Sequence, residues 1–189
     1  MRPGIWIAKP AAAACFVWAA LAWGALDSWY GCWMLAGLLL SACGDLLLIP
    51  RAASAFQAGI AAFLLGHVAY AVAFASSPWS PAVLLVAVLA VAVAAWRIQR
   101  WLLPHVSADF RVPVLAYLTV ISGMVALAVA ASAAGRPVLA AVGAIAFAAS
   151  DISVARNRFV DPSFATTAWG LPLYFASQLA LASTVAAAG

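Results

Sequence analysis

Three ionisable side chains inside apolar segments are the strongest candidates for chemistry in this sequence. They are Asp45, His67 and Asp151. A charged group within a hydrocarbon-length segment costs roughly 2.5–3.5 kcal/mol on insertion scales, so a carboxylate found there is by default a functional candidate. Two carboxyl groups in different protonation states supply a general acid and a general base. The alternative for Asp151 is a structural role, in which it caps its helix or pairs with Arg156 or Arg158 near the interface.

The composition implies that membrane-spanning helices position these residues. The 189 residues are 68% hydrophobic and 7% charged, with a mean hydropathy of +1.11, whereas a soluble domain is about 25% charged. A spanning helix needs about 20 mostly apolar residues. We therefore predict an all-α, polytopic integral membrane helix bundle of about seven transmembrane helices, forming one domain over residues 1–189. No room remains for a soluble catalytic domain, so any chemistry must come from the spans or their ends.

The expected spans alternate with short connections and give the chain an orientation. They cover residues 10–26, 29–49, 54–75, 82–96, 112–132, 138–155 and 164–187, and the connection from Arg97 to Arg111 is polar. On one side only Arg136 is basic, and the other side holds Arg2, Lys9, Arg51, Arg97, Arg100, Arg111, Arg156 and Arg158. The positive-inside rule then predicts a cytoplasmic N-terminus and a C-terminus across the membrane. Because the basic residues lie at span ends rather than in a run, the net charge of +4 reflects topology and not nucleic-acid binding.

The two aspartates are expected at the same depth. Asp45 lies five residues before Pro50 and Asp151 lies five before Arg156, so each is roughly 7 Å inside the cytoplasmic boundary at 1.5 Å per residue. Each also has a glycine eight residues upstream, Gly37 or Gly143, which permits close helix approach. The alternative explanation for the matched spacing is chance.

Other polar side chains fall on helix faces near this level. His67 and Tyr70 share a face of the third span, and Tyr174 and Gln178 are spaced by four on the seventh. Tyr117 lies near the depth of the aspartates. Each set also has a structural alternative. His67 could be a hydrogen-bonded core histidine, Tyr174 and Gln178 could form hydrogen bonds between helices, and Tyr117 could be an interfacial anchor.

Taken together and in order, these residues resemble the YhhN-like lysoplasmalogenase family over about Lys9 to Ala182. Members usually read as eight spans, and this chain is expected to begin at the Lys9-Pro10 element, without the first helix. The resemblance lies in an ordered set of short motifs, of which no single one is specific. They are Gly44-Asp45-Leu46-Leu47, the run from Phe63 to Tyr70, Gly143-Ala144-Ile145-Ala146-Phe147, Ser150-Asp151, Asn157-Arg158-Phe159, and Tyr174 with Gln178.

The resemblance implies a hydrolase that cleaves the vinyl ether bond of lysoplasmalogens into a fatty aldehyde and a glycerophospho-base. Such a reaction needs an acid that protonates the alkene carbon, stabilisation of an oxocarbenium ion, and delivery of water, as in the carboxyl pairs of glycoside hydrolases. Two carboxyl groups at one site of low dielectric resist double ionisation, so one is expected to keep its proton. We expect Asp45 and Asp151 to divide the acid and base roles, while His67 positions water or tunes their protonation.

The substrate would be a lysophospholipid, with membrane lipids as the other partners and no nucleic acid, cofactor or metal. Arg156 and Arg158 are expected to bind its phosphate, because guanidinium matches phosphate oxygens bidentately, although topology alone also explains these arginines. The further substrate-binding candidates are Tyr70, Tyr117, Tyr174 and Gln178. The expected location is a bacterial inner membrane, crossed several times.

Two other function classes stay open on the sequence. A metal-dependent intramembrane lipid hydrolase would use Asp45, His67 and Asp151 as ligands of a zinc-like ion, although catalytic zinc is usually richer in imidazole. A small transporter or lipid-binding protein would use the buried acids for proton relay or recognition. A retinal-type photoreceptor is excluded, because its Schiff base needs a lysine within a span and the one lysine, Lys9, lies at the entrance of the first.

Overall fold

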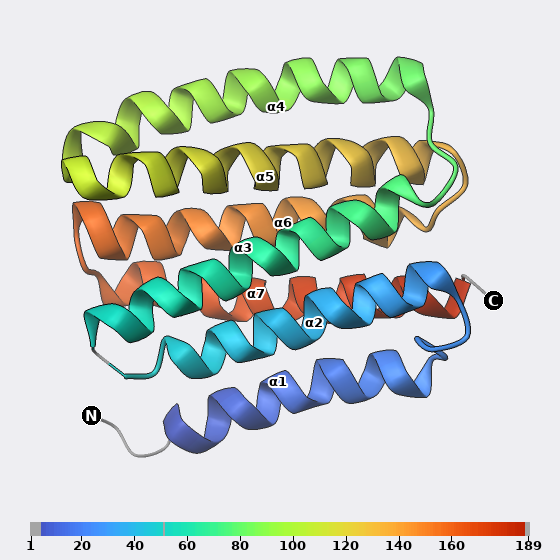
Figure 1. Cartoon of the computed structure of the whole chain (residues 1–189), viewed down its shortest axis with the longest axis horizontal. Coiled ribbons are helices and arrows are strands. Elements are labelled where there is room, and N and C mark those ends of the chain that lie inside the picture. The colour runs from blue at the N-terminus through green and yellow to red at the C-terminus, as the bar shows by residue number, and fades with distance from the viewer. Residues whose placement is uncertain (1–4, 51, 188–189) are drawn as a thin grey trace.

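The structure is a computed structural model that describes residues 5–50 and 52–187. Two of the predicted cytoplasmic arginines, Arg2 and Arg51, lie outside the described residues. Seven α-helices run back and forth along one direction (Figure 1). They are α1 (Ile5–Ala22), α2 (Trp29–Leu47), α3 (Ala53–Ala75), α4 (Pro81–Leu102), α5 (Ala108–Ala133), α6 (Val138–Ala155) and α7 (Phe164–Ser183), with short helical segments η1 (Leu103–His105), η2 (Arg156–Val160) and η3 (Thr184–Ala187).

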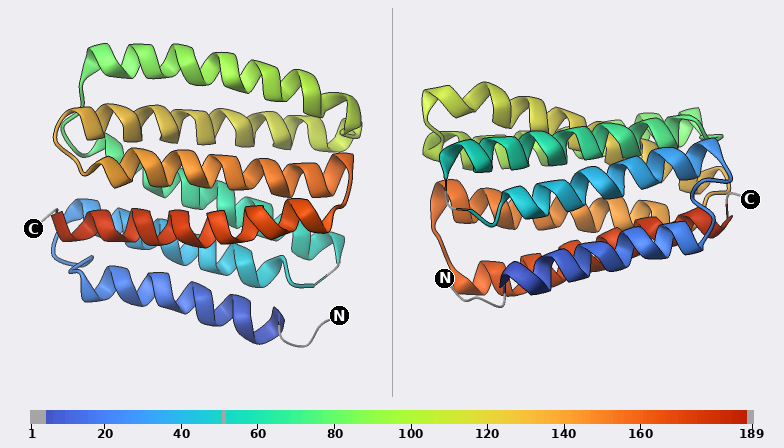
Figure 2. Two further views of the ribbon diagram at one scale, coloured as in Figure 1. Left: turned by 180° about the vertical axis from the view of Figure 1, so that it is seen from behind. Right: turned by 60° about the horizontal axis from the view of Figure 1, so that its bottom comes forward.

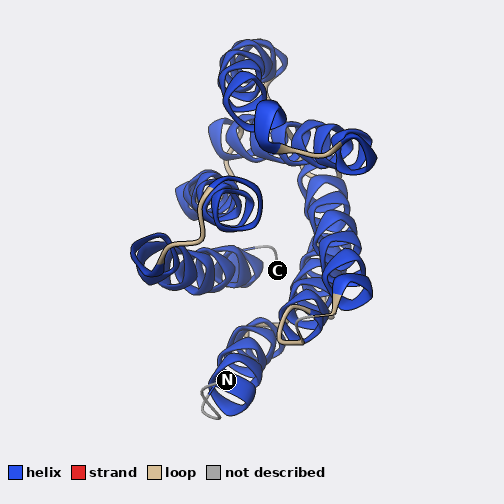
Figure 3. Cartoon of the chain, turned by 90° about the vertical axis from the view of Figure 1, so that its left-hand side faces the viewer, coloured by secondary structure: helices blue, strands red, loops and turns tan. Residues whose placement is uncertain are grey.

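Six of the helices form a ring, and α4 lies outside it. In the ring α1 packs on α2, α2 on α3, α3 on α5, α5 on α6, α6 on α7, and α7 returns to α1. The α6–α7 pair lies on the opposite face from α2 and α3, as the views from behind and below show (Figure 2). Seen from the end of the bundle, α4 is at the outer edge next to α5 and α1 is at the opposite edge (Figure 3). The ring therefore encloses side chains from all six of its helices.

The predicted fold class is confirmed. Six helices are long and apolar enough to cross a membrane, and α1 contributes a shorter apolar helix from Trp6 to Ala22. The helix α1 begins at one end of the bundle and η3 finishes at the other (Figure 1), as an odd number of crossings requires. The cytoplasmic side of the N-terminus stays a prediction.

Two helices differ in extent from the spans predicted for them. The fourth span was expected to end at Trp96, but α4 continues to Leu102 because Arg, Gln and Trp extend a helix readily until Pro104 interrupts it. The first span was expected over residues 10–26. Instead α1 spans Ile5–Ala22 and continues through Pro10, which lacks the N–H for one helical hydrogen bond.

Local sequence signals explain several of the helix ends. The Ser28 hydroxyl accepts a hydrogen bond from the Gly31 backbone N–H at 3.0 Å and caps α2, while Ser80 caps α4 ahead of Pro81. The turn after α1 contains Gly24 at φ 82°, a conformation that glycine adopts without strain. These short turns keep consecutive helices antiparallel.

The predicted close approach at Gly37 and Gly143 is present. A Cβ atom on Gly37 would clash with the Tyr70 ring of α3, and one on Gly143 would lie 3.0 Å from Leu181 Cγ of α7. Small residues let helix backbones approach in a membrane, where packing replaces the hydrophobic effect between helices. The two glycines therefore allow α2 to pack closely on α3 and α6 on α7.

Candidate active site

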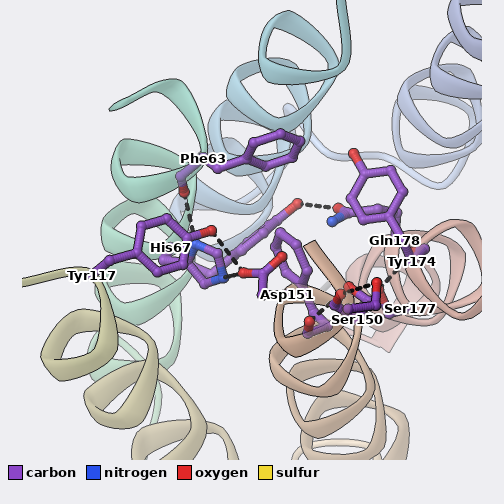
Figure 4. Close-up of polar contacts among 11 residues, drawn as sticks. Phe63, His67, Tyr117, Ser150, Asp151, Tyr174, Ser177 and Gln178 are labelled. Carbon is purple, nitrogen blue, oxygen red and sulfur yellow. Dashed lines mark hydrogen bonds and ion pairs between the residues drawn. The ribbon is translucent and has the colours of Figure 1, made fainter. Parts of the chain in front are cut away.

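Three side chains from three helices of the ring meet at Asp151 of α6. The Tyr117 hydroxyl of α5 donates a hydrogen bond to Asp151 Oδ2 at 2.7 Å, and His67 Nε2 of α3 lies 3.4 Å from the same oxygen. Figure 4 shows the three side chains pointing toward one another. The Asp151 side chain is 16% exposed and lines a cavity, although its Oδ2 atom accepts the hydrogen bond from Tyr117. Within the described residues no arginine pairs with Asp151, which contradicts the structural alternative of an Arg156 or Arg158 pair.

His67 is fixed in position and in tautomer. Its ring is fully buried, stacks on Phe147 with centroids 4.3 Å apart, and has Nδ1 2.7 Å from the Phe63 carbonyl oxygen. Because a carbonyl oxygen only accepts, Nδ1 carries the hydrogen and the neutral ring presents Nε2 as an acceptor. An acceptor nitrogen facing a carboxyl oxygen is favourable only when a proton lies on one of the two. The Asp151–His67 contact is therefore suited to holding one proton between the two side chains.

Asp45 of α2 has a different environment. Its Oδ1 lies 3.1 Å from Lys9 Nζ of α1, and the two side chains are 2% and 14% exposed. The ammonium group favours the charged carboxylate in this low-dielectric setting. In the sequence analysis Lys9 counted only as one of the basic residues that predict the orientation, and this contact was not predicted. The available signal was depth, because Lys9 and Asp45 lie on antiparallel neighbours near the same end of the bundle.

One cavity of about 1120 Å³ connects the two aspartates. Asp45 and Asp151 both line it, together with Tyr117, Tyr174 and Arg158. The predicted common depth therefore corresponds to a common cavity.

The rest of the cavity wall is mostly apolar and includes a face of α4. Residues of α4 line it at helical spacing from Val83 to Leu102, a length of about 28 Å at 1.5 Å per residue. Along α4, all of which is described, only Ala87 and Leu102 are buried. The sequence analysis gave α4 no part in the site, since its residues from Pro81 to Trp96 are uniformly apolar and have no chemical signature.

The structure separates the two arginines that were predicted to bind phosphate. Arg158 lines the cavity and its guanidinium Cζ lies 4.2 Å from the centroid of the Phe56 ring. Arg156 donates to Thr166 Oγ1 at 2.8 Å and is not among the lining residues.

Two further substrate-binding candidates also lie away from the cavity wall. The Tyr70 hydroxyl donates to Gln178 Oε1 at 2.6 Å, both side chains are fully buried, and neither lines the cavity. This is the hydrogen bond between helices that the sequence left open as the alternative. Of the four predicted polar contacts, Tyr117 and Tyr174 are therefore the two at the cavity.

The metal alternative lacks a ligand cluster in the described part of the chain. No group of three or more His, Cys, Asp or Glu side chains there lies close enough together to hold a metal ion. Asp151 and His67 contact each other, while Asp45 contacts Lys9. The ligand set proposed from the sequence is thus divided between two separate contacts.

Comparison with known proteins relates this arrangement to a family. The chain is 38% identical over 135 residues to the proteins named lysoplasmalogenase of Mycobacterium bovis and Mycobacterium tuberculosis, covering 68% of this chain and 50% of each relative. It is 33% identical over 142 residues to lysoplasmalogenase TMEM86B of Homo sapiens, covering 75% of this chain and 58% of that relative. The chain thus spans about half the length of these relatives. No solved structure matches it significantly. The sequence profile of the YhhN family matches residues 4–185, and the chain belongs to this family.

Proposed function

We propose that this protein hydrolyses the vinyl ether bond of lysoplasmalogens, releasing a fatty aldehyde and a glycerophospho-base. The observation that supports this most is the single cavity that Asp151, Asp45 and a long apolar wall all line, with Asp151 contacting the buried His67 and Asp45 contacting Lys9. The names of the relatives point to the same reaction. A lysophospholipid has a charged head group, which suits the polar side chains of the cavity, and one hydrocarbon chain, which suits the apolar wall.

The first step is protonation of carbon. The Asp151–His67 pair gives its proton to the vinyl carbon that is not bonded to oxygen, and the positive charge develops on the adjacent carbon and its ether oxygen. Tyr117 donates to Asp151 Oδ2 at 2.7 Å and stabilises the carboxylate that remains. A hydrogen bond to a charged acceptor is stronger than one to a neutral acceptor, so this contact strengthens as the proton leaves.

Asp45 then stabilises the cation and activates the water. Its carboxylate stabilises the oxocarbenium ion and takes a proton from the water that adds to the cationic carbon. The resulting hemiacetal collapses: its hydroxyl proton returns to Asp151, the carbon–oxygen bond to glycerol breaks, and Asp45 protonates the leaving oxygen. Both carboxyl groups regain their starting states, and one water is consumed for each aldehyde released.

The remaining cavity residues orient the substrate. Arg158 is exposed at the cavity, and no acidic side chain pairs with it in the described ranges, so its guanidinium is available for the phosphate. The hydrocarbon chain would lie along the apolar residues of α4. Pockets for small ligands are usually 300–1,000 Å³, and the cavity of about 1120 Å³ accommodates a single-chain lipid.

The test compares three lysophospholipids that differ only at the first glycerol carbon: a 1-alkenyl, a 1-acyl and a saturated 1-alkyl form. Purified protein should release aldehyde from the alkenyl form alone. Asp151→Asn should abolish release, whereas Asp161→Asn, the same change at an exposed aspartate outside the cavity, should leave it unchanged. Binding of the alkenyl lipid without any aldehyde would refute the hydrolase and favour a lipid-binding protein.

The multi-pass architecture supports a membrane location for the proposed reaction. Six long apolar helices and the shorter α1 leave the site inside the helix bundle. For the cellular location we propose a bacterial plasma membrane. Fractionation of the producing cells, with membrane markers for each compartment, would test it.

A further inference from the structure

Four buried polar atoms around the site have no hydrogen-bond partner within the described residues. They are Asp45 Oδ2, His67 Nε2, Ser41 Oγ and Gln178 Nε2. His67 Nε2 faces Asp151, and Asp45 Oδ2 belongs to a carboxylate at the cavity. The two others have no role in the reaction described above. Ser41 and Gln178 are both fully buried and do not line the cavity.

Helix geometry places Ser41 and Gln178 in a second polar layer. Ser41 precedes Asp45 by four residues on α2, Gln178 follows Tyr174 by four on α7, and Tyr70 follows His67 by three on α3. Residues three or four apart lie on the same helix face, one turn from each other. Since α2 runs opposite to α3 and α7 (Figure 1), all three steps go in the same direction, deeper into the bundle.

Contacts between the helices hold this deeper layer together. The Tyr70 hydroxyl bonds to Gln178 Oε1 at 2.6 Å, and the Tyr174 hydroxyl reaches the Ser41 carbonyl oxygen at 3.5 Å. The Ser41 hydroxyl faces α3, because a Cβ atom on Gly66 would lie 3.2 Å from its oxygen. If the Gln178 amide were turned over, its oxygen would be the unpaired atom instead. In either orientation, one amide group of Gln178 and the Ser41 hydroxyl need a partner.

Water is the partner that suits this chemistry. Buried polar groups in proteins are nearly always hydrogen-bonded, and ordered water supplies the bond where the protein does not. An amide N–H and a hydroxyl oxygen can donate to and accept from the same water, and a carboxylate one turn away can take its proton. The apolar α4 side of the cavity offers no comparable set of groups.

We propose that Ser41 and Gln178 hold the hydrolytic water on the deep side of Asp45, so that water reaches the oxocarbenium ion from within the helix ring while the hydrocarbon chain occupies the opposite, apolar side. The inference rests on the proposed vinyl ether hydrolysis. It makes Ser41 and Gln178 positioning residues that act on the second substrate, water. Tyr70 orients the Gln178 amide.

The experiment uses hydrogen exchange in deuterated water. In the wild-type protein, water captures the cation at once, so substrate recovered at half conversion contains no deuterium. If water is poorly held, the cation survives long enough to lose a proton back to the enzyme. The vinyl carbon of recovered substrate then acquires deuterium from the Asp151–His67 pair.

Ser41→Ala and Gln178→Leu are the test variants. Each should lower kcat about tenfold, the effect of one lost hydrogen bond, leave KM unchanged, and introduce deuterium into recovered alkenyl lysophospholipid, measured by mass spectrometry. Ser177→Ala is the matched control, because the Ser177 hydroxyl donates to the Tyr174 carbonyl oxygen of its own helix at 2.6 Å. It should behave as wild type.

Several outcomes separate this inference from the proposed function. Slower aldehyde release without deuterium in recovered substrate, or wild-type kinetics in both variants, would overturn the water site and leave the hydrolase intact. Absence of aldehyde from the wild-type protein would instead refute the hydrolase. If Gln178→Leu fails to fold, judged by thermal unfolding in detergent, Ser41→Ala decides the question, because it removes a single oxygen atom.

Discussion

Replacement of Lys9 by Met should destabilise the protein by leaving the Asp45 carboxylate buried without its cation. The two groups are 3.1 Å apart, and the side chains of Lys9 and Asp45 are 14% and 2% exposed. Removing one partner from a buried ion pair costs about 3–5 kcal/mol, most of it from the uncompensated charge. Because Lys9 is slightly exposed, we expect a loss of about 3 kcal/mol, at the lower end of this range.

The reciprocal and double variants give the magnitude of the pair interaction. Asp45→Asn should cost only about 1 kcal/mol, since the flexible Lys9 side chain can extend its ammonium toward water. The double variant Lys9→Met with Asp45→Asn contains no buried charge at this position. It should be more stable than the sum of the single effects predicts by about 2 kcal/mol, a coupling typical of directly interacting residues.

Unfolding by SDS of the protein in detergent micelles, followed by circular dichroism, measures these differences. Arg97→Met is the control, because Arg97 is an exposed cation at the same end of the bundle, and exposed substitutions usually change stability by less than about 0.5 kcal/mol. A Lys9→Met protein as stable as the control, or strictly additive single effects, would refute the ion-pair reasoning. Aldehyde release by folded Lys9→Met should also fall, since Asp45 would no longer be held in its charged form.

Four further predictions concern the site and the helix packing. Tyr117→Phe removes the hydrogen bond to Asp151 and should lower kcat about tenfold, measured by aldehyde release. Arg158→Gln should raise KM about tenfold at constant kcat by weakening phosphate binding, whereas Arg156→Gln, whose guanidinium bonds to Thr166 away from the cavity, should change KM less. Ala90→Trp narrows the α4 wall of the cavity and should raise KM for long-chain substrates more than for short-chain ones; equal effects on both would refute the chain position. Gly143→Leu should destabilise the protein by about 1–3 kcal/mol, seen as a lower Tm in detergent, because a Cβ there already meets Leu181 at 3.0 Å.

The site was only partly predictable from local information. The depth of Asp45 and Asp151 followed from their distances to the ends of their spans, because a helix rises by a fixed amount per residue. Their partners did not follow. Tyr117 was a substrate-binding candidate with an interfacial anchor as its alternative, and Lys9 was interpreted as a topological charge, but each contacts an aspartate of the next helix along the chain.

What the sequence by itself determined is the number of helices, their approximate limits and the family. Each of these depends on apolar runs, turn residues and short motifs that act within about 20 residues. Only the tertiary structure decided that α3, α5 and α6 are neighbours, which brings His67, Tyr117 and Asp151 together, and that α4 lies outside the ring and lines the cavity. The physical reason is that the outer surfaces of apolar helices are chemically alike. Neighbours are selected by close packing at glycines such as Gly37 and Gly143 and by a few buried polar contacts, and these depend on all the helices at once.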